Sequence, residues 1–373
     1  MARLGDVCKL VSGNSLPEMI VAEKGELPYV KVAELNLPEN IPNITTSRQF
    51  VSVTNISAKQ IIPVGTVIFP KRGGAIGTNK KRLVSTPICM DLNLMGAIPS
   101  SKLYPQYLYY FFENIDMGAL SNGSSVPQIN NSDIAPLEIR IPDITTQKDI
   151  ATRLDKVTEL IALRKEQLVK LDQLVKSRFI ELFGRPVSNS KGWNTEKMRE
   201  VAPAVNYSGD FEDAVWLLNL DMVEAQTGRI LDYLYVNEEE VGNSTCTFDT
   251  TNVLYSKLRP YLNKVVIPDR CGYATSELIP LKPNSMKLER TYLAFMLRSD
   301  EFVNMINEKV AGAKMPRVSM SDFREFDVPV PPMELQKRFA AFVEQTDKSK
   351  LEIQQSLDKL ELLKKSLMQE YFG

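Results

Sequence analysis

The sequence predicts an α+β protein with two similar mixed α/β modules, each followed by a long helix, and a pseudo-two-fold relation between the halves. Three observations support this prediction. The second half of the chain repeats the first, both halves contain short β-rich runs broken by Pro and Gly, and each half ends in heptad-spaced apolar residues. We expect the first module over 1–142, the first helix over 143–184, the second module over 185–331 and the second helix over 332–373.

The repeat is clearest from Val126 to Gly184, where residue n matches residue n+189 without a gap. Outside this stretch the match continues with small changes of offset, which indicates a shared fold with diverged loops. Such a duplicated chain suits a partner that also has two similar halves, and duplex DNA is the commonest such partner. The matched segments include Val126-Pro127-Gln128-Ile129 with Met315-Pro316-Arg317-Val318, Ile139-Arg140-Ile141-Pro142 with Val328-Pro329-Val330-Pro331, Gln147-Lys148 with Gln336-Lys337, and Phe183-Gly184 with Phe372-Gly373.

Composition excludes several classes of protein. The 373 residues are 43% hydrophobic and 24% charged, as is ordinary for a globular protein of two or three domains. No apolar run reaches the roughly 18 residues of a membrane span, and the N-terminus has no apolar signal region, so we expect a cytoplasmic protein without a membrane partner. The chain contains no histidine, which excludes Ser-His-Asp and Cys-His nucleophile pairs and histidine-ligated metals.

Each module is expected to lead into a long helix. The first should begin after Pro142, with Thr145 or Thr146 as its N-cap, and end at Gly184. About 40 residues would make a rod of roughly 60 Å, and antiparallel pairing of two such rods would give a spacer of defined length; the alternative is a pair of ordinary core helices. The expected helix-pairing residues are Leu154, Val157, Ile161, Leu168, Leu171 and Val175 in the first helix, and Val343, Ile353, Leu357, Leu360 and Leu367 in the second.

A Gly-rich basic loop follows a predicted strand in the first module. The stretch Lys71–Arg82 holds five cations and no acid, and its glycines would allow close approach to a phosphate backbone. The spacing of a P-loop is not met because Thr78 follows Gly77 where a lysine is required, and the alternative to DNA binding is a solvated surface turn. The candidate DNA-binding residues are Lys71, Arg72, Asn79, Lys80, Lys81 and Arg82 here, and Lys257, Arg259 and Lys264 in the second copy.

A loop rich in amides and hydroxyls precedes each helix-entry segment. Glutamine and asparagine can read adenine in the major groove, and arginine can read guanine. The two modules should therefore recognise different sequences if these loops contact bases, whereas the alternative is a turn that only connects a helix to a strand. The candidates are Ser124, Ser125, Gln128 and Asn130 in the first copy, and Lys314 and Arg317 in the second.

Motifs for catalysis were not found. No G-x-G-x-x-G follows a predicted strand, and no N-P-P-[FY] or D-P-P-[YF] motif of amino-methyltransferases occurs. The S-x-x-K match at Ser356–Lys359 lies on the predicted second helix, where Leu357 is a pairing residue. The aromatic segment Tyr104–Phe112 could stack on bases, but its helical pattern favours a short core helix. We therefore assign no catalytic, cofactor-binding or metal-binding residue to this chain.

The order of the parts resembles the specificity (S) subunit of type I restriction–modification systems over essentially the whole chain. The resemblance is carried by the junctions, namely Val126–Ile129 and Ile139–Pro142 before the first helix and Met315–Val318 and Val328–Pro332 before the second. The family often has a Pro-Pro pair and then Glu-Gln before the helix. This chain departs mildly from that pattern, with Pro142-Asp143 and Thr146-Gln147 in the first copy, and Pro331-Pro332 and Leu335-Gln336 in the second.

The resemblance implies a non-catalytic subunit in which each module is a target recognition domain for one half of an asymmetric, bipartite site in double-stranded DNA. It implies that the paired helices set the spacing between the half-sites and dock two methyltransferase (modification) subunits, which restriction/translocase subunits would join. S-adenosylmethionine, ATP and Mg²⁺ would then be bound by those partners.

Two rival hypotheses come from other classes. A self-contained DNA methyltransferase or nuclease would bind S-adenosylmethionine or cleave DNA with a metal, and the missing motifs count against it. A coiled-coil adaptor that binds only proteins would show no sequence preference on DNA, and the basic Gly-rich loops count against it.

Overall fold

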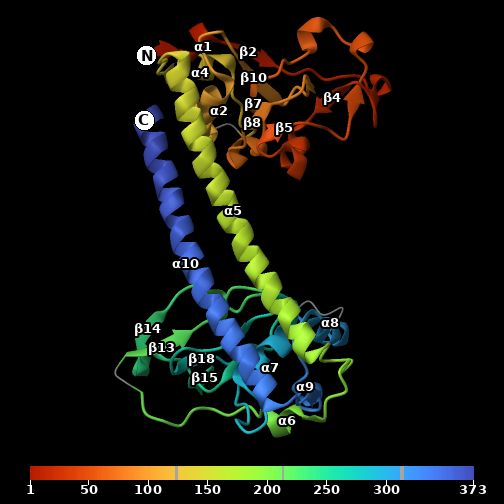
Figure 1. Ribbon diagram of the computed structural model, residues 1–373, viewed down its shortest axis with the longest axis vertical. Helices are drawn as coiled ribbons and strands as arrows, with labels where there is room; N and C mark the ends of the chain where they lie inside the picture. Colours follow the sequence, from red (N-terminus) through yellow and green to blue (C-terminus); the bar gives the residue numbers. More distant parts are fainter. Residues whose placement is uncertain (122–124, 212–213, 311–314) are drawn as a thin grey trace. The chain divides into compact units, whose positions relative to one another are not determined.

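The computed structural model confirms the predicted α+β class (Figure 1). Two compact units are present, one formed by Met1–Lys165 with Gln355–Gly373 and the other by Glu166–Gln354. Each unit combines one module with a part of both long helices, whereas the sequence-based division treats the helices as separate segments. The structure describes residues 1–121, 125–211, 214–310 and 315–373.

Unit 1 is built around a five-stranded sheet of order β2-β10-β7-β8-β5, in which only the β5–β8 pair is parallel. A second sheet has the order β3-β6-β4-β9, and β1 pairs with β11. The strands are β1 Ala2–Arg3, β2 Cys8–Ser12, β3 Val21–Ala22, β4 Leu27–Val30, β5 Asn43–Ile44, β6 Phe50–Val51, β7 Val67–Pro70, β8 Arg82–Val84, β9 Cys89–Met90, β10 Leu94–Pro99 and β11 Glu138–Ile139. The short helices are α1 Leu4–Val7, α2 Pro105–Glu113, α3 Met117–Leu120 and α4 Asn131–Ile134.

Unit 2 contains a three-stranded sheet of order β17-β16-β19 and a four-stranded sheet of order β14-β13-β18-β15, and β12 pairs with β20. In Figure 1 the four-stranded sheet lies to the left of the unit and α8 and α9 to its right. The strands are β12 Thr195–Lys197, β13 Ala214–Leu218, β14 Leu234–Asn237, β15 Thr245–Phe248, β16 Val253–Ser256, β17 Val265–Val266, β18 Gly272–Thr275, β19 Leu278–Leu281 and β20 Asp327–Pro329. The short helices are α6 Met198–Val201, α7 Arg290–Arg298, α8 Asp300–Lys309 and α9 Met320–Arg324.

The same strand pairings occur in both units. The antiparallel pair β7–β10 corresponds to β16–β19, and the parallel pair β4–β9 corresponds to β13–β18. The short helices α2 and α7 occupy equivalent places between the sheets and the long helices in the chain. The repeat seen in the sequence therefore extends to the strand pairings, although its offset varies in these regions.

The aromatic segment of α2 forms part of the core of unit 1. Tyr107 and Phe112 are almost completely buried, and the ring of Phe112 lies 5.1 Å from that of Phe69 on β7. Buried aromatic rings stabilise a core through the apolar area that they remove from water and through ring–ring contacts. The interpretation of this segment as a core helix is therefore confirmed.

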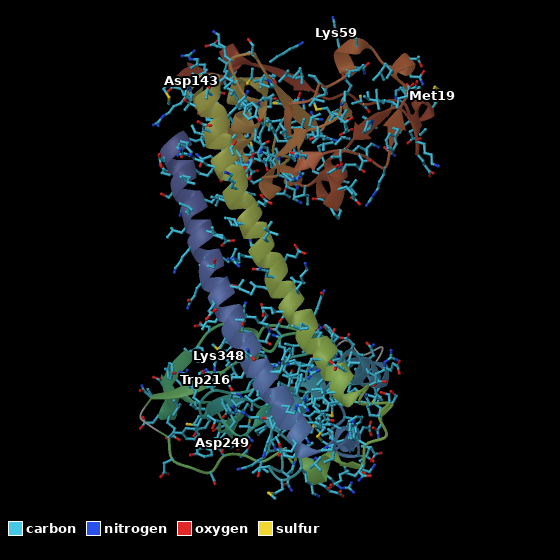
Figure 2. The ribbon with its side chains drawn as sticks, in the orientation of Figure 1. Met19, Lys59, Asp143, Trp216, Asp249 and Lys348 are labelled. Carbon is cyan, nitrogen blue, oxygen red and sulfur yellow. The ribbon has the colours of Figure 1, made fainter. Side chains whose placement is uncertain are left out.

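The long helices are α5, Ile144–Phe183, and α10, Met333–Phe372, each of 40 residues. Asp143 (labelled in Figure 2) caps α5, because its carboxylate accepts the backbone N–H of Thr146 at 3.0 Å and the Thr146 hydroxyl at 2.6 Å. The expectation that Thr145 or Thr146 is the N-cap is therefore wrong. At the other end, Gly184 has φ +76° and its N–H donates to the Ile180 carbonyl at 2.8 Å, as expected for a glycine that ends a helix.

Within each unit the two long helices run antiparallel. In unit 1 the Arg153 guanidinium contacts the Tyr371 hydroxyl at 3.4 Å, and in unit 2 the Lys350 ammonium lies 2.6 Å from the Asp172 carboxylate. The seam positions are occupied as follows: Leu154, Val157, Val175, Val343 and Leu357 are buried, and Ile161, Leu168, Leu171, Ile353, Leu360 and Leu367 are half-buried.

A buried glutamine in the first turns of α5 ties the helix to the module of unit 1. The Gln147 side chain is completely buried, and its amide nitrogen donates to the carbonyls of Lys102 and Pro142 at 2.9 and 2.8 Å. Its amide oxygen accepts the backbone N–H of Tyr104 at 2.8 Å. One side chain thus satisfies three main-chain groups around the start of α2 and the entry to α5.

Gln336 makes the same three contacts in unit 2. Its amide nitrogen donates to the carbonyls of Lys287 and Pro331 at 2.9 and 2.7 Å, and its oxygen accepts the backbone N–H of Glu289 at 2.8 Å. This side chain is also completely buried. The repeat in the sequence matched the two glutamines to each other. Their hydrogen bonds between each long helix and its module were not predicted.

Gln336→Leu is expected to lower the free energy of unfolding of unit 2 by about 2–4 kcal/mol, because three main-chain hydrogen bonds are lost at a buried site. Equilibrium urea unfolding followed by tryptophan fluorescence measures this effect, since Trp193 and Trp216 are the only tryptophans and both lie in unit 2. Gln345→Leu, at an exposed position of the same helix, is the matched control. Equal stability of the two variants would contradict the role assigned to Gln336.

Candidate nucleic-acid interface

Two loops that are far apart in the sequence lie side by side in unit 1. The chain after β7 pairs with the segment before α4, through a hydrogen bond from the Gly73 N–H to the Pro127 carbonyl at 2.8 Å and one from the Ile129 N–H to the Lys71 carbonyl at 2.9 Å. Residues 71–79 and 125–130 are called the paired loops of unit 1 below. The basic loop and the amide-rich loop of the sequence are thus brought together.

The paired loops of unit 2 are residues 257–263 and 315–319. The Arg259 N–H donates to the Pro316 carbonyl at 2.8 Å, and the Val318 N–H donates to the Lys257 carbonyl at 2.9 Å. These are the counterparts of the two hydrogen bonds in unit 1. The backbone of this region is therefore repeated although its side chains differ.

The conformation of the basic loop is repeated as well. In unit 1 it is a 3₁₀ turn over Gly74–Thr78, preceded by Gly73 and followed by Asn79 in the left-handed region. In unit 2 the turn covers Pro260–Leu262, with the left-handed residues Arg259 at φ +50° and Asn263 at φ +50° on either side. Arg259 adopts a backbone conformation that favours glycine. An arginine at this position therefore carries some backbone strain.

Several side chains of the paired loops of unit 1 are accessible. Arg72, Ser125 and Asn130 are exposed, and the backbone of Arg72 bridges to that of the half-buried Gln128. The Gln128 amide nitrogen donates to the Asn130 side-chain oxygen at 2.9 Å. This contact orients an amide that could form two hydrogen bonds with one base edge. The same loops therefore present both a cation and an oriented amide.

The neighbouring lysines are partly engaged. The Lys71 ammonium donates to the Ser12 hydroxyl at 2.9 Å, and partial burial, with a smaller effect of the Arg72 charge, lowers its pKa from the ordinary range. The half-buried Lys80 donates to the side-chain oxygen of Asn36. The side-chain oxygen of Asn79 accepts the backbone N–H of Met117 at 2.9 Å, so this group supports the loop.

Lys81 and Arg82 are not surface phosphate donors, and their inclusion among the candidates is wrong. Lys81 is 1% exposed and its ammonium donates to the carbonyl of Ile115 and the side-chain oxygen of Asn79, both at 2.7 Å. The Arg82 guanidinium is also buried, and it donates to the carbonyls of Lys81 and Leu35 at 2.7 and 2.8 Å. Both cations satisfy main-chain groups inside unit 1.

In unit 2 the cations also differ in accessibility. Arg259 is exposed and Lys257 is half-buried, whereas the Lys264 ammonium donates to the Leu220 carbonyl at 2.6 Å and burial lowers its pKa. Arg317 has a side chain that is 58% exposed, and its guanidinium forms an ion pair with Glu277 at 2.7 Å. Two further candidates, Ser124 and Lys314, lie outside the described residues.

No group of three or more His, Cys, Asp or Glu residues suited to a metal ion was found in the described parts of the chain. None of the helices in those parts has the length and hydropathy needed to cross a membrane.

Exposed cations beside amide or guanidinium groups, repeated in two modules, are features typical of proteins that recognise DNA. The chain matches the family described as "Type I restriction modification DNA specificity domain" over residues 1–173 and 226–363. This protein belongs to that family, whose role is recognition of DNA and not catalysis.

Similar proteins cover almost the whole chain. The specificity subunit of the type I restriction enzyme EcoDI from Escherichia coli is 21% identical, across 99% of this chain and 86% of that protein. The MjaIX specificity subunit from Methanocaldococcus jannaschii is 22% identical, across 90% of this chain and 83% of that protein.

Solved structures show the same fold. The S subunit of a type I restriction–modification system from M. genitalium superposes with a TM-score of 0.59 at 16% identity, covering 100% of this chain and 95% of that one. A chain from a structure that addresses complex assembly and conformational transition of the type I R-M system gives a TM-score of 0.60 at 16% identity, covering 100% and 96%.

The buried Lys81 should leave a signature in the pH dependence of stability. Burial lowers the pKa of its ammonium to about 8, with the charges of Glu113 and Asp116 opposing the shift. The folded protein then loses this proton before the unfolded chain does, so the cost of the buried charge present at pH 7 disappears as the pH rises toward the usual lysine value.

Between pH 7 and 9.5 the unfolding free energy of the wild type should rise by about 2 kcal/mol relative to that of Lys81→Met. Urea unfolding followed by circular dichroism at each pH gives this difference. Lys59→Met, at an exposed lysine of unit 1, should keep the wild-type pH dependence. Parallel pH profiles for the wild type and Lys81→Met would show that Lys81 is not buried as described.

Proposed function

We propose that this protein reads an asymmetric, bipartite site in double-stranded DNA, with each unit contacting one half-site through its paired loops. The observation that carries the proposal is the pair of equivalent hydrogen bonds that hold these loops together in both units, beside different side chains. A binding protein can change its specificity in this way without changing its fold, because the backbone frame is independent of the side chains that reach the ligand.

The side chains at equivalent positions suit different bases. Gln128 in unit 1 and Arg317 in unit 2 occupy the same place in the repeat. Glutamine matches the donor and acceptor pattern of adenine in the major groove, and arginine matches the two acceptors of guanine. The half-sites are therefore expected to differ in sequence.

Phosphate contacts would come from cations in or directly after the same loops. These are the exposed Arg72 and the half-buried Lys71 and Lys80 in unit 1, and the exposed Arg259 and the half-buried Lys257 in unit 2. The net charge of the whole chain is −1, so counterion release contributes little beyond these residues. The isolated chain should consequently bind DNA with modest affinity.

The remaining components are proposed from the family. Two methyltransferase (modification) subunits would dock on the long helices, and restriction/translocase subunits would join them. Exposed apolar side chains on α5 and α10 within unit 1, such as Leu160, Leu163 and Leu362, offer surface for such contacts. S-adenosylmethionine, ATP and Mg²⁺ would be bound by these partners, and methyl transfer and cleavage would take place there.

The direct test is selection of a random duplex library with the full chain and its methyltransferase subunits, followed by sequencing of the bound fraction. The proposal expects two enriched half-sites separated by a spacer of constant length. It also expects that the methyltransferase subunits raise the affinity for that site by more than tenfold. Absence of enrichment, or enrichment of a single contiguous site, would overturn the proposal.

Arg72→Ala should weaken binding to all duplex sequences by about threefold to tenfold at 0.1 M salt. It should also reduce the slope of log K against log salt by about one, because one phosphate contact is lost. Fluorescence anisotropy with labelled duplexes over a salt series measures both quantities. Lys59→Ala removes the same charge at an exposed position, seen at the top of unit 1 in Figure 2, and should leave the slope unchanged. An unchanged slope for Arg72→Ala would remove this residue from the interface.

A further inference from the structure

Glu277 joins the paired loops of unit 2 to a third segment of the chain. It lies in the turn between β18 and β19, and its carboxylate accepts a hydrogen bond from the Arg317 guanidinium at 2.7 Å. Its backbone carbonyl accepts the N–H of Lys257 at 3.0 Å. Glu277 therefore contacts both loops, one through its side chain and the other through its main chain.

Unit 1 has an uncharged residue at the equivalent place. The backbone carbonyl of Asn93 accepts the N–H of Lys71 at 2.8 Å, which corresponds to the contact between Glu277 and Lys257. The Asn93 side chain, however, donates to the carboxylate of Asp91 at 2.6 Å. The carboxylate that holds Arg317 is thus a feature of unit 2, where the reading candidate is an arginine.

The ion pair between Arg317 and Glu277 contributes little to the stability of unit 2. Because the Arg317 side chain is 58% exposed, solvent screens the attraction and the pair adds little to the stability of the fold. The Glu277 side chain is only 20% exposed, and its second oxygen is buried without a hydrogen-bond partner among the described residues. A carboxylate in this position loses hydration that one ion pair does not fully restore.

We propose that Glu277 is a positioning residue that orients the Arg317 guanidinium toward guanine and so sets the base preference of unit 2. The inference rests on the proposed function. The contact with Glu277 uses one terminal nitrogen of the guanidinium and leaves other N–H donors of the planar fork free for O6 and N7 of one guanine. An arginine without this contact can turn to the phosphate backbone, which carries no sequence information.

If Glu277 positions Arg317, its neutralisation should change base preference and non-specific affinity in different ways. Neutralising Glu277 removes a negative charge beside the DNA, so the affinity for non-specific duplex should stay the same or increase. The preference for guanine over adenine at one position should fall at the same time. General damage to unit 2 would lower both quantities together.

The test compares the wild type with Glu277→Gln in the random duplex selection, using the full chain with its methyltransferase subunits. The expected result is a loss of about tenfold in the preference for guanine at one position of one half-site. The other half-site should be unchanged, and it serves as an internal control for folding and assembly. Arg317→Gln should shift the same position toward adenine, as expected from Gln128 in unit 1.

Glu196→Gln is the matched control, because Glu196 forms a 2.6 Å ion pair with Lys287 elsewhere in unit 2. It should leave the guanine preference unchanged. An unchanged guanine preference in Glu277→Gln, or an equal loss in Glu196→Gln, would overturn the inference while two enriched half-sites would still support the proposed function. A wild type that enriches no site would overturn the proposed function and the inference with it.

Discussion

A buried glutamine at the start of each long helix is the contact on which the rest of each unit depends. Gln147 and Gln336 are completely buried, and each side chain makes three hydrogen bonds to main-chain groups of its own unit. Buried carbonyl and N–H groups are costly without partners, so these amides hold the helix in one orientation relative to the neighbouring short helix. Apolar contacts alone would allow the helix more freedom, because they are not directional.

A second shared contact lies next to each glutamine. The Tyr107 hydroxyl donates to the Arg140 carbonyl at 3.0 Å, and the Tyr292 hydroxyl donates to the Pro329 carbonyl at 2.9 Å. The entry to each helix is therefore fixed by two polar side chains that act on the main chain. The paired loops lie in the same units but differ in their side chains, so recognition can diverge while the frame that supports it is kept.

The exposure of individual cations in the basic segment could not be predicted from the sequence. Lys71, Arg72, Lys80, Lys81 and Arg82 look alike as a run of cations, yet Arg72 is exposed while Lys81 and Arg82 are buried. The Lys81 ammonium donates to the carbonyl of Ile115, and the Arg82 guanidinium donates to the carbonyl of Leu35. Both carbonyls belong to residues that are distant in the sequence. In unit 2, Glu277 holds Arg317 although 40 residues separate them, and no periodicity in the chain indicates such a pair.

The repeat, the heptad spacing and the composition were enough to predict the duplicated architecture, the positions of the long helices and the absence of histidine chemistry, because these are local or additive properties of the chain. It also indicated both loops of the candidate interface. The pairing of these loops, the capping of α5 by Asp143 and the exposure of individual cations became known from the folded chain alone. Burial and hydrogen-bond partners depend on segments that meet only after folding, so their effect on a side chain is not written in its immediate neighbours.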